Sequence, residues 1–599
     1  MIESLHAGNF FFHPALFFFL GACILPFVKG WLRNVFIIAV PLASLLLVLF
    51  LGYGEHWQVQ IGGMEITLGR VDRLSLVFTY IFCLMSIIGS LYGLHIKENW
   101  QTMAAWGYVG SALGCTLAGD YLSLFFFWEG LMVTSVCLVW LRGTEESLRA
   151  GFRYILVHTF GGLCLLAGIF VLYFQTGDIT FGPMPDGVAL AAWLIMIGFL
   201  LNAAVPPLHA WLPDAYGSAT VVGSVFMCAY TTKTAVYTLA RAFAGFEILI
   251  PLGVIMALYG VVYAVLENDT RRLLSYHIIS QVGYMVAGVG IGTEMAINGA
   301  TAHAFAHILY KSLLFMGVGS VIAATGRSKF SELGGLWKYM PWTFVFTLIG
   351  GLSISAFPFF SGFISKSMVI AGAWEDHRTW AALLLTLASA GTFLHTGLKV
   401  PYFIWFNREE PPFEPPKKEA PWNMMAAMGI GAYFCIMLGC NPQFLYSMLP
   451  YPVNYQPYTA THVMASYQVL LFTMLGFFLL LKQLKPKPLI GLDVDWFYRK
   501  GSIPFMAFCR NVPAAIDTVV ISRLHATVAL PLLRLCSRIS SWNDIRVVDG
   551  LIDGAANGVL RFSRSMRLIA QPGSLSKYLA GMLTFLAGTV MAAVALALY

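Results

Sequence analysis

The sequence predicts an all-α integral membrane protein with about sixteen transmembrane helices. Of its 599 residues, 58% are hydrophobic and 11% are charged, whereas a soluble domain is nearer half apolar and a quarter charged. The apolar residues recur in runs of about 20, the length that a helix needs to cross the hydrocarbon core. The net charge of +7 lies in loops between these runs, which indicates a membrane face and excludes nucleic acid as a partner.

The apolar runs divide the chain into six predicted parts. These are N-terminal transmembrane helices (1–102), a first repeat (103–243), a second repeat (249–406), C-terminal transmembrane helices (407–482), a basic amphipathic lateral segment (483–576) and a final transmembrane helix (577–599). The lateral segment mixes Val and Leu with Arg, which is typical of an interfacial helix. A partly ordered connector is the alternative, and Pro531 argues against one unbroken helix.

The basic residues of the short loops predict the orientation. If the N-terminus is outside, the loops that become cytoplasmic carry most of the Lys and Arg, whereas the opposite loops hold only Arg70, Arg73, Arg241 and Arg378. This asymmetry follows the positive-inside rule. We expect a multi-pass protein of the bacterial cell (inner) membrane, with the basic loops and residues 482–576 in the cytoplasm.

Cofactor and metal signatures are absent from the sequence. The ten cysteines are scattered and form no C-x-x-C pair, so we expect no zinc ribbon or iron–sulfur centre. The glycines at 288, 290 and 292 end a membrane span instead of following a strand, which excludes a dinucleotide site. The sequence therefore predicts no cofactor and no bound metal.

Four lysines and one carboxylate lie inside predicted spans, where a charge costs from about 3 kcal/mol upward. They are Glu129, Lys233, Lys311, Lys366 and Lys399. Such residues usually face the protein interior or a water-filled path, so they are functional candidates. Lys399 lies near the end of its span, and its side chain reaching to the membrane surface is the alternative there.

Titratable residues also recur at helical spacing. His303, His307 and Lys311 are spaced i, i+4, i+8 and share one helix face, which favours a proton path. Two structural histidines or a zinc-binding pair are the alternatives. His395 and Lys399 repeat the i, i+4 spacing and form a candidate second relay or exit.

Two apolar spans are interrupted by proline, at residues 202–215 and 353–366. Proline frees backbone carbonyls, which is tolerated where a cavity or a neighbouring helix satisfies them. Paired broken helices indicate an ion site in inverted-repeat transporters. Two ordinary kinks are the alternative.

Six stretches of the sequence carry a family resemblance: DYLSLFFFWEG, PPLHAWLPDA, TKTAVYTLAR, ENDTRRLLSYHIISQVGYM, HAFAHILYKSLLFMG and SGFISK. Together they resemble the antiporter-like subunits of respiratory complex I and of Mrp-type sodium/proton antiporters. GLDVDWFYRK (491–500) is similar to the Mrp D-type subunit. The resemblance implies about fourteen core helices with two inverted five-helix repeats, each holding a broken helix.

The resemblance also implies roles for individual residues. Glu129 corresponds to the family's glutamate on the fifth helix, Lys233 to its lysine on the eighth, and Lys366 to the charged outward gate. His303, His307 and Lys311 correspond to the central His–His–Lys line. Asp269 and Arg271 lie in a motif that usually carries lysine.

One position departs from the family pattern. Asn202 stands where a lysine usually pairs with the fifth-helix glutamate, and asparagine cannot carry a proton as lysine does. The first half-channel is then altered or silent, or Arg153 or Lys233 substitutes as the partner, or Glu129 is protonated at rest and carries the proton itself.

Three functions are compatible with these residues. The first is a proton (cation) translocating subunit of a multisubunit Na⁺(K⁺)/H⁺ antiporter. The alternative is a proton-pumping membrane-arm subunit of a complex I-like NADH–quinone oxidoreductase or a membrane hydrogenase, which a continuous helix over 482–576 favours; a short folded tail favours the antiporter. The third is a non-pumping subunit altered at Asn202. We expect other membrane subunits, protons and Na⁺ or K⁺ as partners, and no redox chemistry in this chain.

Overall fold

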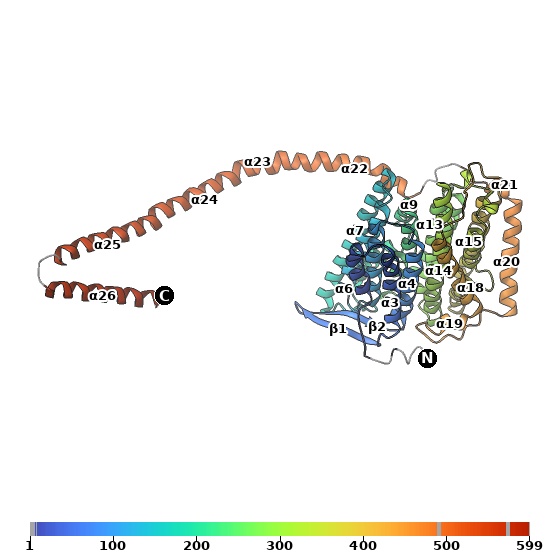
Figure 1. Ribbon diagram of the computed structural model, residues 1–599, viewed down its shortest axis with the longest axis horizontal. Coiled ribbons are helices and arrows are strands. Elements are labelled where there is room, and N and C mark those ends of the chain that lie inside the picture. Colours follow the sequence, from blue (N-terminus) through green and yellow to red (C-terminus); the bar gives the residue numbers. More distant parts are fainter. Residues whose placement is uncertain (1–5, 7–8, 488–492, 571–574, 598–599) are drawn as a thin grey trace. The chain divides into compact units, whose positions relative to one another are not determined.

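The computed structural model describes residues 6, 9–487, 493–570 and 575–597. The chain forms two compact units, Met1–Asp495 and Trp496–Tyr599. In the first unit the long helices run side by side along one common direction (Figure 1). Helices suit such a chain because they satisfy every backbone polar group internally, which hydrocarbon requires.

The first unit contains the following elements in chain order. They are α2 (Ala15–Ile24), α3 (Trp31–Val48), β1 (Gly54–Ile61), β2 (Met64–Val71), α4 (Arg73–Tyr92), α5 (Asn99–Leu117), α6 (Tyr121–Trp140), α7 (Glu145–Thr176), α8 (Ala189–Asn202), α9 (Trp211–Ser218), α10 (Val221–Met227), α11 (Thr231–Ala242), α12 (Leu249–Leu266), α13 (Thr270–Ile291), α14 (Glu294–Thr325), α15 (Pro341–Ile354), α16 (Ser361–Glu375), α17 (Thr379–Thr392), α18 (Trp422–Cys440), α19 (Pro442–Tyr446), α20 (Ala460–Leu479) and α21 (Leu481–Leu484). Helix α17 continues in π-helical turns, Phe393–Lys399 and Tyr402–Phe406.

Within the described residues, nine helices are long and apolar enough to cross a membrane, and four apolar helices are shorter. The multi-pass membrane class is thus confirmed, whereas the count of about sixteen stays a prediction. Two kinds of helix do not meet the length and hydropathy that define a membrane span here. Interrupted spans are short, as in α8 and α15, and α13 is almost wholly buried and carries polar residues such as His277 and Gln281.

The helical fold class is confirmed, with one local exception that the sequence analysis did not expect. Strands β1 and β2 form an antiparallel hairpin in which Ile61 pairs with Met64 and Gly54 with Val71. The connection is Gly62-Gly63, and both residues have positive φ (60° and 84°), as tight two-residue hairpin turns require. The hairpin and α19 lie at the same end of the helix bundle (Figure 1).

The two proline-interrupted spans break with the same backbone geometry. Ala204 and Ala356, each two residues before a proline, are in the left-handed region with φ of 60° and 56°. The next residue donates its N–H five residues back in both, from Val205 to Leu200 (3.1 Å) and from Phe357 to Leu352 (3.1 Å). Both spans therefore end in a full helix stop, not in an ordinary proline kink.

The second unit, described by itself, contains one uninterrupted helical run from Asp495 to Ala570. Its elements are α22 (Asp495–Ala515), α23 (Ser522–Leu524), α24 (Leu530–Trp542) and α25 (Asp549–Ala570), joined by π-helical segments Ile516–Ile521, His525–Ala529 and Asn543–Val548, followed by α26 (Leu575–Ala597). The expectation that Pro531 breaks this helix is wrong. Pro531 lies in the first turn of α24, directly after a π-helical segment, where the missing N–H is tolerated.

Helices α12 and α13 approach each other closely through glycine. A Cβ atom built on Gly283 would lie 2.5 Å from the carbonyl oxygen of Gly253 and 2.6 Å from the backbone nitrogen of Ala257. Neither backbone atom can move aside as a flexible side chain would. A side chain at position 283 must therefore separate the two helices.

We predict that Gly283→Val lowers the thermal unfolding midpoint of the detergent-solubilised protein, because overpacking costs about 1–3 kcal/mol. Gly476→Val is the matched control, since a Cβ there meets no atom within 4 Å. Equal midpoints for the two variants would contradict the packing argument.

Candidate functional site

Two buried lysines donate to carbonyl groups at helix interruptions. Lys233 opens α11, and its Nζ donates to the carbonyl oxygen of Cys228, in the gap between α10 and α11, and to Thr232 Oγ1 (3.1 Å). Lys366, on α16, donates to the carbonyl oxygen of Ile354 at the end of α15 (2.7 Å). A helix end leaves such carbonyls without an intrahelical partner. Each lysine therefore satisfies a group that a break exposes.

Lys399 is placed in a comparable way. Its side chain is buried, and its Nζ donates to the carbonyl oxygens of Val265 (2.7 Å) and Glu267 (2.8 Å) at the end of α12. The alternative that it reaches along the lipid to the membrane surface does not describe this geometry.

The predicted His–His–Lys line lies along α14, wholly buried. The rings of His303 and His307 are 6.2 Å apart between centroids. His303 Nδ1 lies 3.1 Å from Ser365 Oγ on α16 and its Nε2 lies 3.4 Å from the hydroxyl of Tyr310. The line therefore contacts the second broken span directly beside Lys366.

Lys311, at the other end of the line, differs from the other lysines in its hydrogen bonding. Its side chain is fully buried, and within the described chain its Nζ has no hydrogen-bond partner; it lies 5.9 Å from the ring centroid of Phe315. The adjacent Ser312 Oγ lies 3.3 Å from Cys228 Sγ, and the Cys228 carbonyl accepts from Lys233. These contacts connect Lys233 to the residue beside Lys311, and His307 lies one helical turn before Lys311 on α14.

Three further polar residues extend the chain of contacts, and the sequence did not single them out. His277 on α13 packs against His395, with ring centroids 4.7 Å apart. The ring of Tyr284 lies 5.2 Å from Lys366 Nζ and 5.8 Å from the ring of His303. His277, Gln281 and Tyr284 recur at helical spacing within one buried helix, and this periodicity was the available signal.

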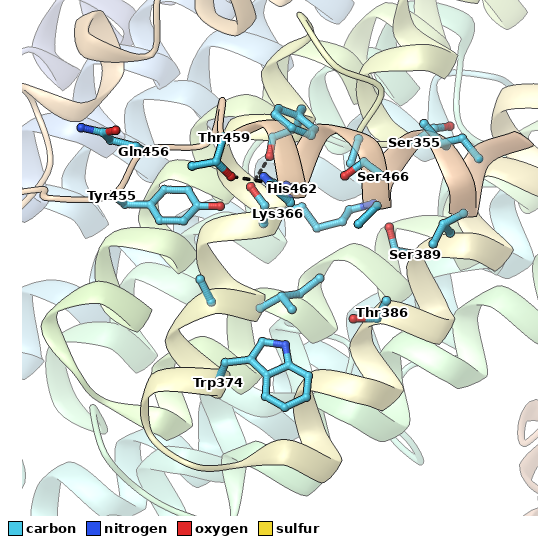
Figure 2. Close-up of a pocket in the computed structure, with 18 of the residues that line it drawn as sticks. Ser355, Lys366, Trp374, Thr386, Ser389, Tyr455, Gln456, Thr459, His462 and Ser466 are labelled. Carbon is cyan, nitrogen blue, oxygen red and sulfur yellow. Dashed lines mark hydrogen bonds between the residues drawn. The ribbon is translucent and has the colours of Figure 1, made fainter.

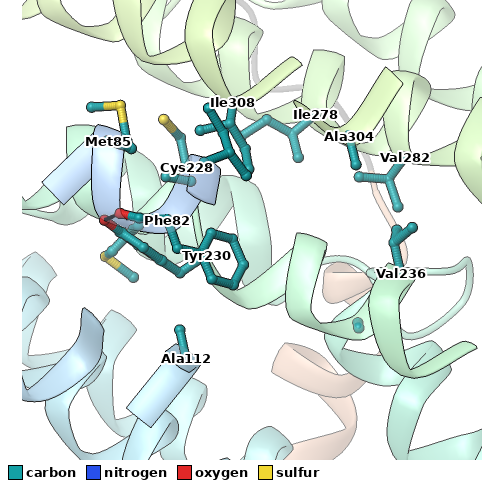
Figure 3. Close-up of a cluster of buried hydrophobic side chains, with 14 of the residues drawn as sticks. Phe82, Met85, Ala112, Cys228, Tyr230, Val236, Ile278, Val282, Ala304 and Ile308 are labelled. Atoms are coloured by element: carbon teal, nitrogen blue, oxygen red, sulfur yellow. Dashed lines mark hydrogen bonds between the residues drawn. The ribbon is translucent and has the colours of Figure 1, made fainter. Parts of the chain in front are cut away.

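Apolar side chains surround this polar line. Figure 3 shows Ala304 and Ile308 of α14 beside Ile278 and Val282 of α13, with Val236 of α11 close to them. All five are buried. Bulk water is therefore excluded from the centre, and a proton there has only side chains or single enclosed waters to bind.

An open cavity of about 570 Å³ lies against Lys366. Its walls are formed by α16, α17, α20 and the segment before α20 (Figure 2). The ring of His462, at the start of α20, stacks on Phe363 at 4.7 Å. The polar lining residues include Lys366, Thr386, Ser389, Gln456, Thr459 and His462.

Glu129 and Asn202 are not satisfied by a lysine. Glu129 Oε1 and Asn202 Oδ1 are both buried without a hydrogen-bond partner in the described part of the chain. Arg153, one of the two candidate partners of Glu129, makes a bidentate ion pair with Asp214 of α9 (2.7 and 2.9 Å). Lys233, the other candidate, is bound at the α10–α11 gap.

Asp269 and Arg271 hold helix ends in place. Asp269 Oδ1 accepts the backbone N–H of Arg271 (2.9 Å) and of Arg272 (3.1 Å), which is an N-cap of α13. Arg271 Nη1 donates to the carbonyl oxygen of Ala219, just before α10 (2.7 Å). Both residues therefore position helices that carry the polar line.

Comparison with known proteins agrees with this architecture. The model of the NADH:quinone oxidoreductase/Mrp antiporter transmembrane family matches residues 118–392. A chain in the Mrp complex structure from Dietzia sp. DQ12-45-1b superposes with a TM-score of 0.66 at 20% identity, covering 78% of this chain and 99% of that one. At this identity the likeness concerns the fold.

Two curated relatives are similar in sequence. An uncharacterized protein of Methanocaldococcus jannaschii is 30% identical over 462 residues, covering 72% of this chain and 94% of the relative. The D-type Na⁺/H⁺ antiporter subunit of Alkalihalophilus pseudofirmus is 32% identical over 294 residues, 46% of this chain and 59% of the antiporter protein. The match therefore spans about three fifths of that relative. The family resemblance is confirmed: this multi-pass membrane chain belongs to the NADH:quinone oxidoreductase/Mrp antiporter family.

Proposed function

We propose that the chain translocates protons in exchange for Na⁺ or K⁺, as a subunit of a multisubunit cation/proton antiporter. The carrying observation is a line of buried polar side chains through an apolar core, in which Lys311 Nζ and the ring nitrogens of His307 have no hydrogen-bond partner in the described residues. It begins at Lys233, continues through Cys228 and Ser312 beside Lys311, follows His307 and His303 along α14, and ends through Ser365 at Lys366.

The residues of this series suit proton transfer. An ammonium group can lose a proton and an imidazole can gain or lose one, so each can pass a proton to a neighbour. The Nζ of Lys311 and both ring nitrogens of His307 are buried without partners in the described residues. Such groups recruit enclosed water, which closes the gaps that exceed a hydrogen bond.

Lys366 and the cavity beside it form the proposed outer end of the path. Lys366 contacts the polar line on one side, through the neighbouring Ser365, and lines the cavity on the other. His462 supplies a titratable ring in the cavity wall. The first half, with Glu129 and Asn202, is altered relative to the second, because among the described residues Glu129 Oε1 has no hydrogen-bond partner.

The remaining features of the assembly follow from this proposal. Residues 103–243 and 249–406 are the two repeats, each with one of the matching breaks. The protein lies in the bacterial inner membrane with the N-terminus outside and the basic loops cytoplasmic. Its partners are other membrane subunits, and it carries no redox group of its own.

A second candidate is the proton-pumping membrane subunit of a complex I-like enzyme. The observation that favours it is the uninterrupted helical run from Asp495 to Ala570, because a long helix can lie along several partner subunits. The same polar axis would then be driven by electron transfer in another subunit.

We predict that Lys311→Ala lowers cation/proton exchange about a hundredfold, because the central proton carrier is lost. Lys311→Arg should be equally inactive, since arginine keeps its proton. Exchange is measured in inside-out vesicles holding the whole complex, with a pH-sensitive dye. Lys97→Ala, at an exposed lysine, is the control and should exchange normally; wild-type rates in Lys311→Ala would contradict the proposal.

We predict that Asn202→Lys accelerates exchange in the same vesicles, because it places a proton carrier beside the altered first half. Asn202→Gln keeps the position neutral and should leave the rate unchanged. An unchanged rate in Asn202→Lys would show that the path bypasses this residue.

We predict that filling the cavity slows exchange. Ala465→Trp, in the cavity wall on α20, should reduce the rate about tenfold by blocking access to Lys366, since an inserted indole displaces several waters. Leu471→Trp, at an exposed position of the same helix, is the control. Equal rates in both variants would exclude the cavity as the outer end of the path.

A further inference from the structure

A carboxylate from the segment before α22 is buried against the first broken span. Asp493 accepts hydrogen bonds from His209 Nε2 (3.1 Å), in the turn between α8 and α9, from Tyr276 of α13 (2.5 Å) and from Tyr259 of α12. His209 and Asp493 are both buried. Gly491 and Leu492 of the same motif lie outside the described residues.

The partners of Asp493 fix its ionisation and the tautomer of His209. The backbone N–H of Val494 donates to Asp493 (2.6 Å) and both tyrosine hydroxyls can donate to it, which suits an ionised, acceptor-only carboxylate. His209 must then carry hydrogen on Nε2. Its Nδ1 is buried without a hydrogen-bond partner in the described chain, and in the neutral ring this nitrogen is a free proton acceptor.

The electrostatics around Asp493 agree with a permanent carboxylate. Burial raises the pKa of Asp493, but the hydrogen bonds from His209, Tyr259 and Tyr276 bring the pKa below its ordinary value. The Arg272–Glu267 ion pair (3.0 Å) lies near the start of α13, and both of its charges interact electrostatically with the hydroxyl group of Tyr276.

His209 also belongs to the segment that packs into the first half of the protein. Two residues further, Trp211 Nε1 donates to the carbonyl oxygen of Leu201, next to Asn202 (3.0 Å). The Trp211 ring lies 4.4 Å from that of His158 on α7. In the same region Arg153 and Asp214 form an ion pair with each other.

We propose that Asp493 is a positioning residue that holds His209 with Nδ1 free to accept a proton, so that His209 supplies proton entry where Asn202 replaces the family's lysine. In this step a hydronium ion donates a proton to Nδ1 and becomes water, and the imidazolium then returns the proton from Nδ1 to a water enclosed in the first half; no other bond changes. This inference rests on the proposed proton translocation.

The test is the pH profile of exchange in vesicles holding the whole complex, with the rate normalised to assembled complex. Removing the negative charge beside His209 disfavours its protonated form, so Asp493→Asn should shift the half-maximal pH downward by about one unit. Asp493→Glu keeps the charge and should retain the wild-type midpoint. Asp544→Asn, at an exposed carboxylate of the second unit, is the matched control and should not shift it.

One further variant keeps the result decisive if Asp493→Asn assembles poorly. His209→Gln can still donate to Asp493 but cannot carry a proton, and it should slow exchange about tenfold or more.

A wild-type midpoint in Asp493→Asn, or a wild-type rate in His209→Gln, would overturn the role of this pair. Lys311→Ala in the same vesicles separates the two levels of the argument. If Lys311→Ala is inactive while the variants at 493 and 209 behave as wild type, only the entry role fails. If Lys311→Ala also exchanges normally, the proposed translocation itself fails.

Discussion

Hydrocarbon offers no hydrogen bonds, and the whole site depends on how this chain satisfies its buried polar groups. A broken span exposes carbonyl oxygens, and a buried lysine needs acceptors; either group alone costs several kcal/mol. Lys233 and Lys366 each donate to a carbonyl at a helix interruption. The break and the lysine therefore stabilise each other. Loss of the lysine's proton weakens this bond, so protonation is coupled to the backbone of the broken span.

Lys311 differs because within the described chain no carbonyl or carboxylate binds its Nζ. It lies between two lysines that are bound and beside histidines that can exchange protons. A carbonyl that accepts from a buried ammonium favours the charged form of the lysine, and Lys311 has no such bond in the described chain. The centre of the line is thus the weakly held position, and its two ends are the firmly held ones.

The sequence predicted those features whose signal is local. A lysine in an apolar run and a proline within a span are each visible without a partner. The pair of His209 and Asp493 was not predicted, because 284 residues separate its members and neither is unusual alone. Pro531 misled because the π-helical segment before it has no sequence signature. The hairpin was missed although Gly62-Gly63 between alternating residues is a local turn signal.

The two halves share a backbone break but differ in the charge that holds it. Lys366 follows the end of α15 by twelve residues, and Asp214 holds the same place after α8, where it is paired with Arg153. An ion pair keeps both charges fixed, whereas a lysine on a carbonyl can lose its proton without leaving an opposite charge unpaired. The first break therefore carries a paired charge, whereas the second carries a lysine bound by a backbone carbonyl. A proton that enters the first half needs another titratable group, and His209, which bonds Asp493, is the group that we propose for it.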